Sequence, residues 1–123
     1  MTIALWCVLV AGLLPYVGTV IAKAGAGFDN RDPRAWLAQQ QGFRRRANAA
    51  SMNAFEALPL FAAAVLIAHM LRGPQHSANL LAIGFIAARA AHLGCYLADL
   101  AALRSVAWLA GLACVIALFV NSA

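Results

Sequence analysis

The chain has 123 residues, of which 64% are hydrophobic and only 11% are charged, and it carries a formal net charge of +5. Soluble domains are roughly 45 to 50% apolar, so this composition excludes an ordinary soluble protein and indicates a membrane protein. The excess of arginine and lysine has no aqueous face on which a nucleic-acid site could be built, so we expect no nucleic-acid partner.

Four apolar segments are long enough to cross a bilayer, because an α-helix needs about 20 residues to span a hydrocarbon core of about 30 Å. We therefore expect an all-α fold, namely an integral membrane four-helix bundle whose antiparallel helices run up and down. The chain is expected to form one domain, 1–123, with spans at about 2–22, 46–71, 77–98 and 104–121.

The first span could also be a secretory signal peptide. Such a peptide has a basic start and an apolar core of roughly 7 to 15 residues. Here no Lys or Arg precedes Lys23, and the apolar run fills nearly all of 2–22. We therefore expect a retained helix, bent at Pro15.

Basic residues are concentrated between the first and second spans. Only Arg72 follows the second span, whereas the first connection and its borders contain Lys23, Arg31, Arg34, Arg44, Arg45 and Arg46. The positive-inside rule places this connection in the cytoplasm, so both termini are expected in the periplasm of a bacterial inner membrane. The same charges suit contact with the anionic lipids of the bilayer.

A short helix is expected inside the first connection. Asp32 directly precedes Pro33, and an aspartate before a proline is a common start of a helix. We expect this helix to run through Trp36 and Leu37 and to lie at the membrane interface.

The three cysteines, Cys7, Cys95 and Cys114, all fall inside predicted spans. They lack the CxxC or Cys/His spacing that is typical of zinc sites, and their expected role is that of small buried hydrophobic side chains. We predict neither a metal site nor a disulfide framework.

Polar residues interrupt the second span. Arg46, Asn53 and Glu56 follow one another at intervals of seven and three residues, which places them on one face of a helix with 3.6 residues per turn. A carboxylate this far inside an apolar helix indicates a functional site or a charge partner on a neighbouring helix.

The third span repeats this arrangement with Arg89, His92 and Tyr96 on one face. Glu56 and Arg89 both lie about 15 Å inward from the nearer end of their spans. A lone charge at a helix centre costs roughly 2.5 to 3.5 kcal/mol, so we predict that Glu56 contacts Arg89. Such a pair could simply lock two helices together, but the other polar residues on the two faces favour a hydrated binding pocket.

The fourth span begins with another polar group, in which Arg104, Ser105 and Trp108 lie within about one helical turn. Alone, Arg104 would be an ordinary cation whose stem lies along the apolar surface while its charge reaches water. Beside the polar faces of the second and third spans, it completes a polar ring near the predicted cytoplasmic boundary.

These motifs together resemble a known family. The run "RRRANAASMNAFEALPLF" at 44–61 contains N-x-x-E-x-x-P, formed by Asn53, Glu56 and Pro59, and it is followed by "ARAAHLGCYL" and "LRSVAW". In this order the motifs resemble the MAPEG family, the membrane-associated proteins in eicosanoid and glutathione metabolism. The loop "FDNRDPR" is similar to that of bacterial members, and the resemblance covers nearly the whole chain from Phe28 onward.

The resemblance implies a homotrimer of four-helix subunits, with glutathione as co-substrate between neighbouring subunits near the cytoplasmic side. Arg104 matches the arginine that the family assigns to the glutathione sulfur, and Ser105 is its neighbour, so these two are the expected catalytic residues. The implied glutathione-binding residues are Arg46 as a carboxylate clamp, Asn53, Glu56, Arg89, His92 and Tyr96.

Two positions depart from the family pattern. Eicosanoid-forming members typically carry an arginine three residues after the Arg46 position, where this chain has Ala49. One prostaglandin-forming branch carries a tyrosine where this chain has Trp108. Either Arg46 serves from one turn away, or the tripeptide sits differently, or the site takes another ligand.

The residue types themselves suit glutathione, which presents two carboxylates, an ammonium and a thiol. Arginine forks bind carboxylates, an acid binds the ammonium, and a cation near sulfur favours the thiolate over the thiol, whose reference pKa is about 8.5. We predict a membrane-bound glutathione-dependent transferase or peroxidase that acts on lipophilic electrophiles or hydroperoxides arriving from the bilayer.

Two other functions remain open at this point. A non-catalytic lipid-binding or scaffold member of the same family would keep the trimer, and Ala49 favours it. A small proton-coupled transporter could use Glu56 as its carrier. Small four-span exporters usually place that glutamate in the first helix, which is uncharged here.

Overall fold

The computed structural model describes residues 1–25 and 27–123, and these form four long helices and one short helix. Their bounds, in chain order, are α1 (Ile3–Lys23), α2 (Pro33–Ala38), α3 (Gly42–Arg72), α4 (His76–Leu97) and α5 (Ala101–Ser122).

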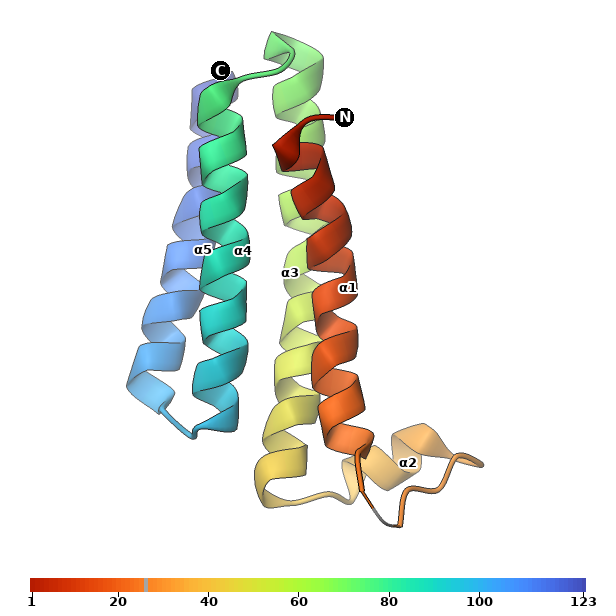
Figure 1. The fold of residues 1–123 in the computed structure, drawn as a ribbon. Helices are drawn as coiled ribbons and strands as arrows, with labels where there is room; N and C mark the ends of the chain where they lie inside the picture. Colours follow the sequence, from red (N-terminus) through yellow and green to blue (C-terminus); the bar gives the residue numbers. More distant parts are fainter. Residues whose placement is uncertain (26) are drawn as a thin grey trace.

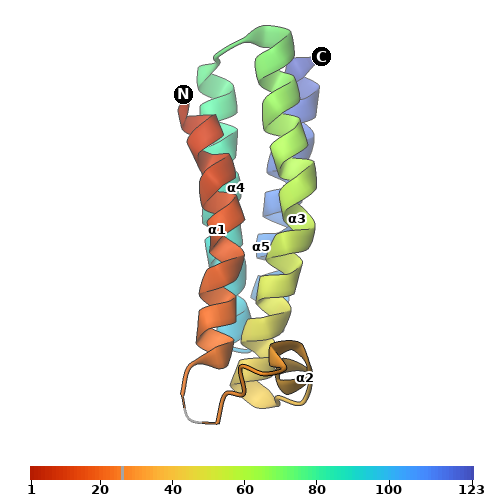
Figure 2. The ribbon, with the colours of Figure 1, turned by 90° about the vertical axis from the view of Figure 1, so that its right-hand side faces the viewer.

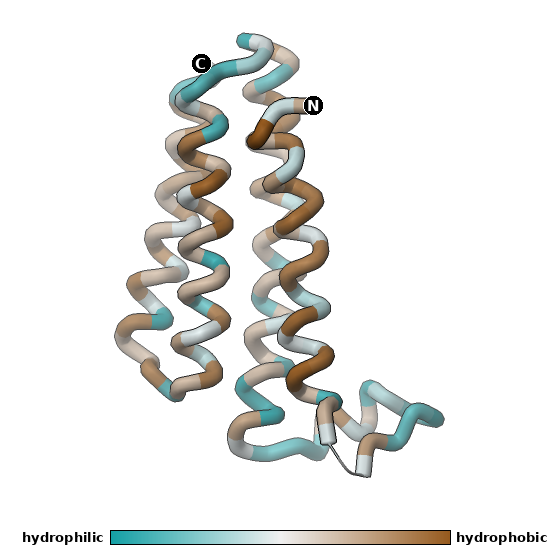
Figure 3. Tube along the Cα trace, in the orientation of Figure 1, coloured by the Kyte–Doolittle hydropathy of each residue, from teal (hydrophilic) through white to brown (hydrophobic). Residues whose placement is uncertain are grey.

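The four long helices run antiparallel in one bundle, with both chain termini at one end and α2 at the other (Figures 1 and 2). We call these the terminal end and the α2 end. Each long helix is long and apolar enough to cross a membrane. Figure 3 shows hydrophobic residues along the helices and hydrophilic residues at the loops. The predicted all-α, four-helix integral membrane fold is therefore confirmed.

The short helix α2 forms where the sequence predicts it. The Asp32 side chain accepts a hydrogen bond from the Ala35 N–H at 3.2 Å, and Pro33 occupies the first helical position. A cap of this kind satisfies a backbone donor that has no partner inside the helix. The helix includes Trp36 and Leu37, as expected.

Helices α3 and α4 form the middle of the bundle, because they contact each other and each also contacts both α1 and α5. The most extensive packing joins α1 to α3 and α4 to α5. Residues on the facing sides of α3 and α4 therefore lie inside the bundle. Residues of α3 that face α5 lie along one side of the bundle.

An apolar core fills the terminal half of the bundle. At its centre the rings of Phe61 and Phe85 stack with centroids 3.9 Å apart and an angle of 7° between their planes. The other buried members of this core are Ala4, Cys7, Ala11, Ala64, Val65, Ala78, Ala82, Val115 and Leu118. Because most are small, the helices approach closely, as is common in membrane bundles.

The α2 half of the bundle buries polar side chains instead. Ser51 of α3 and Arg89 and His92 of α4 are only 3%, 4% and 3% exposed, respectively. The interior thus changes from apolar to polar along its length. This change places the polar faces predicted for the second and third spans in the half that contains α2.

Helices α1 and α3 cross closely in the polar half. The Ser51 hydroxyl donates to the Pro15 carbonyl at 2.7 Å and lies 2.7 Å from the Thr19 hydroxyl. A methyl group added at Gly18 would lie 2.9 Å from the Ala47 carbonyl oxygen and 3.1 Å from the Ser51 Cβ. The crossing therefore requires a residue without a side chain at position 18.

The connection between α1 and α3 is held by aromatic and cationic contacts. The rings of Phe28 and Trp36 meet edge to face at 5.2 Å. The Lys23 ammonium lies 5.1 Å from the Phe28 ring centre, and the Arg44 guanidinium lies 5.6 Å from that of Trp36. Arg44 also donates to the Ala24 carbonyl at 2.8 Å, so the connection is tied to the ends of both helices.

The close crossing predicts that Gly18→Ala destabilises the bundle. We expect a free energy of unfolding lower by about 1 to 3 kcal/mol than that of the matched variant Gly12→Ala, because the added methyl overpacks the contact. At Gly12, also within α1, the new methyl would meet only Leu58, at 3.9 Å. Thermal unfolding in detergent micelles measures the difference, and equal midpoints for the two variants would contradict it.

Candidate functional site

Three adjoining hollows form one groove along α3, α4 and α5. The first, which we call the mouth, lies at the α2 end, has a volume of about 380 Å³ and is lined by Gln41, Gly42, Arg45, Arg46, Ala49, Tyr96 and Asp99. The middle hollow, of about 430 Å³, is lined by Asn53, His92, Tyr96, Arg104, Ser105, Trp108 and Leu109. The deep hollow, of about 260 Å³, is lined by Asn53, Glu56, Ala57, Leu60, Phe85, Arg89, Trp108, Gly111, Leu112 and Val115.

Shared lining residues place the three hollows next to one another. Tyr96 lines both the mouth and the middle hollow, and Asn53 and Trp108 line both the middle and the deep hollow. The structure brings all of the sequence-predicted site residues to this groove, namely Arg46, Asn53, Glu56, Arg89, His92, Tyr96, Arg104 and Ser105. Their assignment to a ligand remains a prediction.

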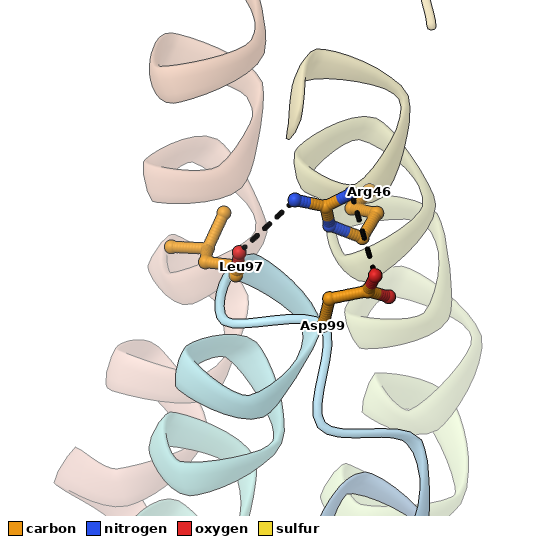
Figure 4. A network of polar contacts seen from close by, with 3 residues as sticks. All are labelled: Arg46, Leu97 and Asp99. Carbon is orange, nitrogen blue, oxygen red and sulfur yellow. Dashed lines mark hydrogen bonds and ion pairs between the residues drawn. The ribbon is translucent and has the colours of Figure 1, made fainter. Parts of the chain in front are cut away.

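At the mouth, Arg46 bridges the start of α3 and the turn between α4 and α5 (Figure 4). Its Nη1 lies 3.9 Å from the Asp99 carboxylate, and its Nη2 donates to the Leu97 carbonyl at 3.4 Å. Its Nε is buried and makes no hydrogen bond. Ala49 lines the same hollow, so no second guanidinium stands one turn further along α3.

In the middle hollow, the Arg104 guanidinium lies 4.4 Å from the centre of the Tyr96 ring, within the range of a cation–π contact. The His92 ring meets the Tyr96 ring edge to face, with centroids 5.2 Å apart. The Ser105 hydroxyl donates to the Ala101 carbonyl at 3.2 Å. Within the described residues Arg104 makes no ion pair, so its charge is available to an anion in this hollow.

In the deep hollow, the buried guanidinium of Arg89 donates from Nη2 to the Asn53 side-chain oxygen at 2.6 Å. Its Nε has no hydrogen-bond partner. A small interior space behind Arg89, lined also by Ser51 and His92, has no room for a water molecule. Further stabilisation of the Arg89 charge must therefore come from the groove.

The predicted contact between Glu56 and Arg89 is wrong. The ion pair that the structure shows among residues 1–25 and 27–123 joins Arg46 to Asp99, whereas Arg89 bonds to Asn53. Arg89 lies inside the bundle, while Glu56 is exposed on the flank of α3. The Asn53 side chain, which is shorter and lies one turn nearer the α2 end, accepts the hydrogen bond from the Arg89 guanidinium. Glu56 lines the same deep hollow as Arg89 without forming an ion pair with it.

Sequence reasoning missed the apolar side of the groove. Gly111, Leu112 and Val115 follow Trp108 at intervals of three to four residues, so they share one face of α5, and the structure places this face in the deep hollow. The helical spacing was a usable signal. Which apolar face would line a hollow and which would meet lipid depends on helix packing, which the spacing does not give.

The arrangement suits a ligand with a charged end and an apolar end. Cationic side chains stand along the mouth and the middle hollow, while the far wall of the deep hollow is formed by aliphatic and aromatic side chains. Anions bind arginine forks, and an apolar group gains free energy by leaving water for such a wall. The groove can therefore hold a polar anion beside a lipophilic molecule.

Comparison with known proteins identifies one family. The family model described as MAPEG family matches residues 3–123, which is nearly the whole chain. No curated protein and no solved structure is matched.

The bond from Arg89 to Asn53 predicts that Asn53→Ala lowers the free energy of unfolding by about 1 to 3 kcal/mol, because a buried donor loses its acceptor. Asn48→Ala on the same helix is the control, since Asn48 makes only a 4.0 Å contact with the Met52 sulfur, and it should change stability by less than about 0.5 kcal/mol. Chemical unfolding in micelles compares them. An Asn53→Ala protein as stable as the control would show that Arg89 does not need this acceptor.

Proposed function

Because this chain belongs to the MAPEG family, which includes glutathione transferases and peroxidases, we propose that it is a membrane-bound glutathione-dependent transferase or peroxidase. Its substrates are lipophilic electrophiles or hydroperoxides. The observation that carries this proposal is the groove, in which Arg46 and Arg104 stand beside a hollow with an apolar wall.

The charges along the groove match the groups of glutathione. Arg46 at the mouth takes a carboxylate, and Glu56 in the deep hollow takes the ammonium. The two lie about 15 Å apart along α3, which suits an extended tripeptide, since fully extended chains span about 3.3 to 3.6 Å per residue and the γ-linked glutamate adds length. Asn53, His92 and Tyr96 supply hydrogen-bonding groups between these ends.

Arg104 stabilises the glutathione thiolate, with Ser105 beside it. Bound glutathione supplies a sulfur nucleophile for an electrophilic carbon or for the distal oxygen of a hydroperoxide. The thiolate is the reactive form, and each unit by which a nearby cation lowers the thiol pKa corresponds to about 1.4 kcal/mol. The Tyr96 ring under the Arg104 guanidinium holds this charge in place without neutralising it.

The lipophilic substrate enters from the bilayer into the deep hollow. Leu60, Phe85, Leu112 and Val115 line this hollow, and hydrophobic compounds concentrate in the lipid around it. Asn53 and Trp108 line both the deep and the middle hollow. A substrate bound in the deep hollow therefore has its reacting group near the middle hollow, which Arg104 lines.

We also propose that the protein forms a homotrimer in a bacterial inner membrane, with both termini in the periplasm. Glu56 is exposed in a single subunit, and a lone charge at membrane depth costs roughly 2.5 to 3.5 kcal/mol. A neighbouring subunit over the flank of α3 and α5 would separate this carboxylate from lipid. The basic connection between α1 and α3 supports the cytoplasmic location of the α2 end.

The alternative is a non-catalytic lipid-binding or scaffold member of the same family. Ala49 at the mouth and the apolar wall of the deep hollow support it, because the hollow can hold a lipid chain without glutathione. Lipid that copurifies with the protein while glutathione at millimolar concentration leaves no bound tripeptide would favour this alternative.

The thiolate role predicts that Arg104→Ala lowers conjugation activity by at least about tenfold, which corresponds to about 1.4 kcal/mol of transition-state stabilisation. The variant should also abolish the ultraviolet absorbance of bound glutathione thiolate at neutral pH. Arg31→Ala is the control, because Arg31 is an exposed arginine at the same end of the bundle. Equal activity and equal thiolate absorbance in the wild type and Arg104→Ala would exclude the role.

The apolar hollow predicts that the size of residue 111 limits the chain length of the electrophile that binds. A methyl there would lie 3.6 Å from the Arg89 Cδ and 3.7 Å from the Ala88 Cβ, which are ordinary contacts, so Gly111→Ala should behave like the wild type. Gly111→Leu narrows the hollow and should raise KM for a long-chain electrophile by about tenfold or more, whereas KM for a short-chain electrophile that does not reach the apolar wall should stay within about twofold. An unchanged KM for the long-chain electrophile would place its binding site elsewhere.

A further inference from the structure

Asp99 occupies a backbone position that normally belongs to glycine. At the end of α4 the Asp99 N–H donates to the Tyr96 carbonyl at 3.2 Å, and the Leu100 N–H donates to the Cys95 carbonyl at 2.9 Å. This pair of bonds defines a Schellman turn, whose residue in the left-handed conformation is usually glycine. Asp99 has φ of 60°, whereas the other positive φ angles of the described chain belong to glycines.

An aspartate at this position is less favourable than glycine, because its Cβ crowds the backbone when φ is positive. Residues held in such conformations cluster at functional sites. The carboxylate of Asp99 projects into the mouth of the groove, 3.9 Å from the Arg46 Nη1. The unfavourable backbone therefore places a negative charge beside the predicted carboxylate clamp.

Stability does not account for this aspartate. The Asp99 side chain is 72% exposed, the Arg46 side chain is 29% exposed, and 3.9 Å is a long distance for an ion pair. Exposed pairs of this kind contribute little to stability. Arg46 is also held by the Leu97 carbonyl, at the negative end of the α4 dipole, so it does not depend on Asp99 for its position.

We infer that Asp99 is a positioning residue that weakens the hold of Arg46 on an anionic ligand, by acting as a competing carboxylate. The inference rests on the proposed function, in which Arg46 binds a carboxylate of glutathione. The charged groups that line the mouth are Arg45, Arg46 and Asp99. An incoming carboxylate must displace Asp99 from Arg46, and Asp99 then turns to water.

This competition suits the chemistry of the reaction. A glutathione conjugate keeps both carboxylates of the tripeptide, so a clamp that holds the substrate tightly also holds the product tightly. A weak internal competitor weakens the hold of Arg46 on both molecules, so that accumulated conjugate inhibits the enzyme less. Ala49, about one turn further along α3, carries no charge, so Asp99 tunes Arg46 as the clamp.

The test is Asp99→Asn, because asparagine tolerates positive φ and removes only the charge. We expect KM for glutathione to fall about two- to fivefold with kcat unchanged at low salt, because uniform binding is strengthened, and we expect the difference to shrink at high salt. Asp99→Gly should lower KM in the same way and should be at least as stable as the wild type, because it relieves the backbone.

Two controls separate competition from a general charge effect. Asp29→Asn removes a carboxylate from an exposed loop at the same end, where Asp29 only accepts a hydrogen bond from the Arg31 N–H, and it should leave KM within about 1.5-fold. In an Arg46→Gln background, Asp99→Asn should have no effect, because the competitor has lost its target. A KM that rises in Asp99→Asn, or a change of the same size without Arg46, would overturn the inference.

A measurement without glutathione distinguishes failure of this inference from failure of the proposed function. Phenylglyoxal modifies accessible arginines, and mass spectrometry of the intact protein and its peptides follows Arg46. We expect faster modification of Arg46 in Asp99→Asn than in the wild type, and equal rates would refute the competition. If the rates differ but the wild type binds no glutathione at millimolar concentration, the competition stands and the glutathione assignment fails.

Discussion

The buried guanidinium of Arg89 is the constraint on which the polar half of the bundle depends. A lone charge inside a membrane costs roughly 2.5 to 3.5 kcal/mol, and Arg89 is only 4% exposed. A hydrogen bond of 2.6 Å to the side-chain oxygen of Asn53 on α3 offsets part of this cost. Helices α3 and α4 must therefore face each other in one register in this half, and that register aligns the polar face of α3 with that of α4 along the groove.

The two halves of the bundle divide the tasks of folding and binding. The terminal half holds the stacked rings of Phe61 and Phe85 and the small residues around them, and close packing of these side chains stabilises it. Because this packing stabilises the fold, the α2 half can contain side chains that do not contribute to stability. One of these is Arg104, whose guanidinium lies over the Tyr96 ring.

The sequence predicts the helices and the faces of the groove but not the pairing within it. Hydropathy and helical spacing are local properties, so they locate the spans and put Asn53 and Glu56 on one side of α3. Which of the two reaches Arg89 depends on how α4 is rotated against α3, and this rotation depends on contacts between residues far apart in the sequence, such as Phe61 and Phe85. The sequence does not predict the position of Asp99 for a similar reason, because the conformation of a turn residue depends on how the preceding helix ends.

The distribution of charge along the groove gives the strongest physical reason to expect a ligand there. At the α2 end, where water has access, Arg46 and Asp99 balance each other. Further inward, where charge is most costly, Glu56 has no ion-pair partner in the part of the chain that the structure describes, and Arg104, which lies between the two levels, has none either. A membrane protein that served only as a packed bundle would show the reverse order, with its deepest charges paired and its outermost charges solvated. The observed order is that of a site completed by something that carries both an anion and a cation.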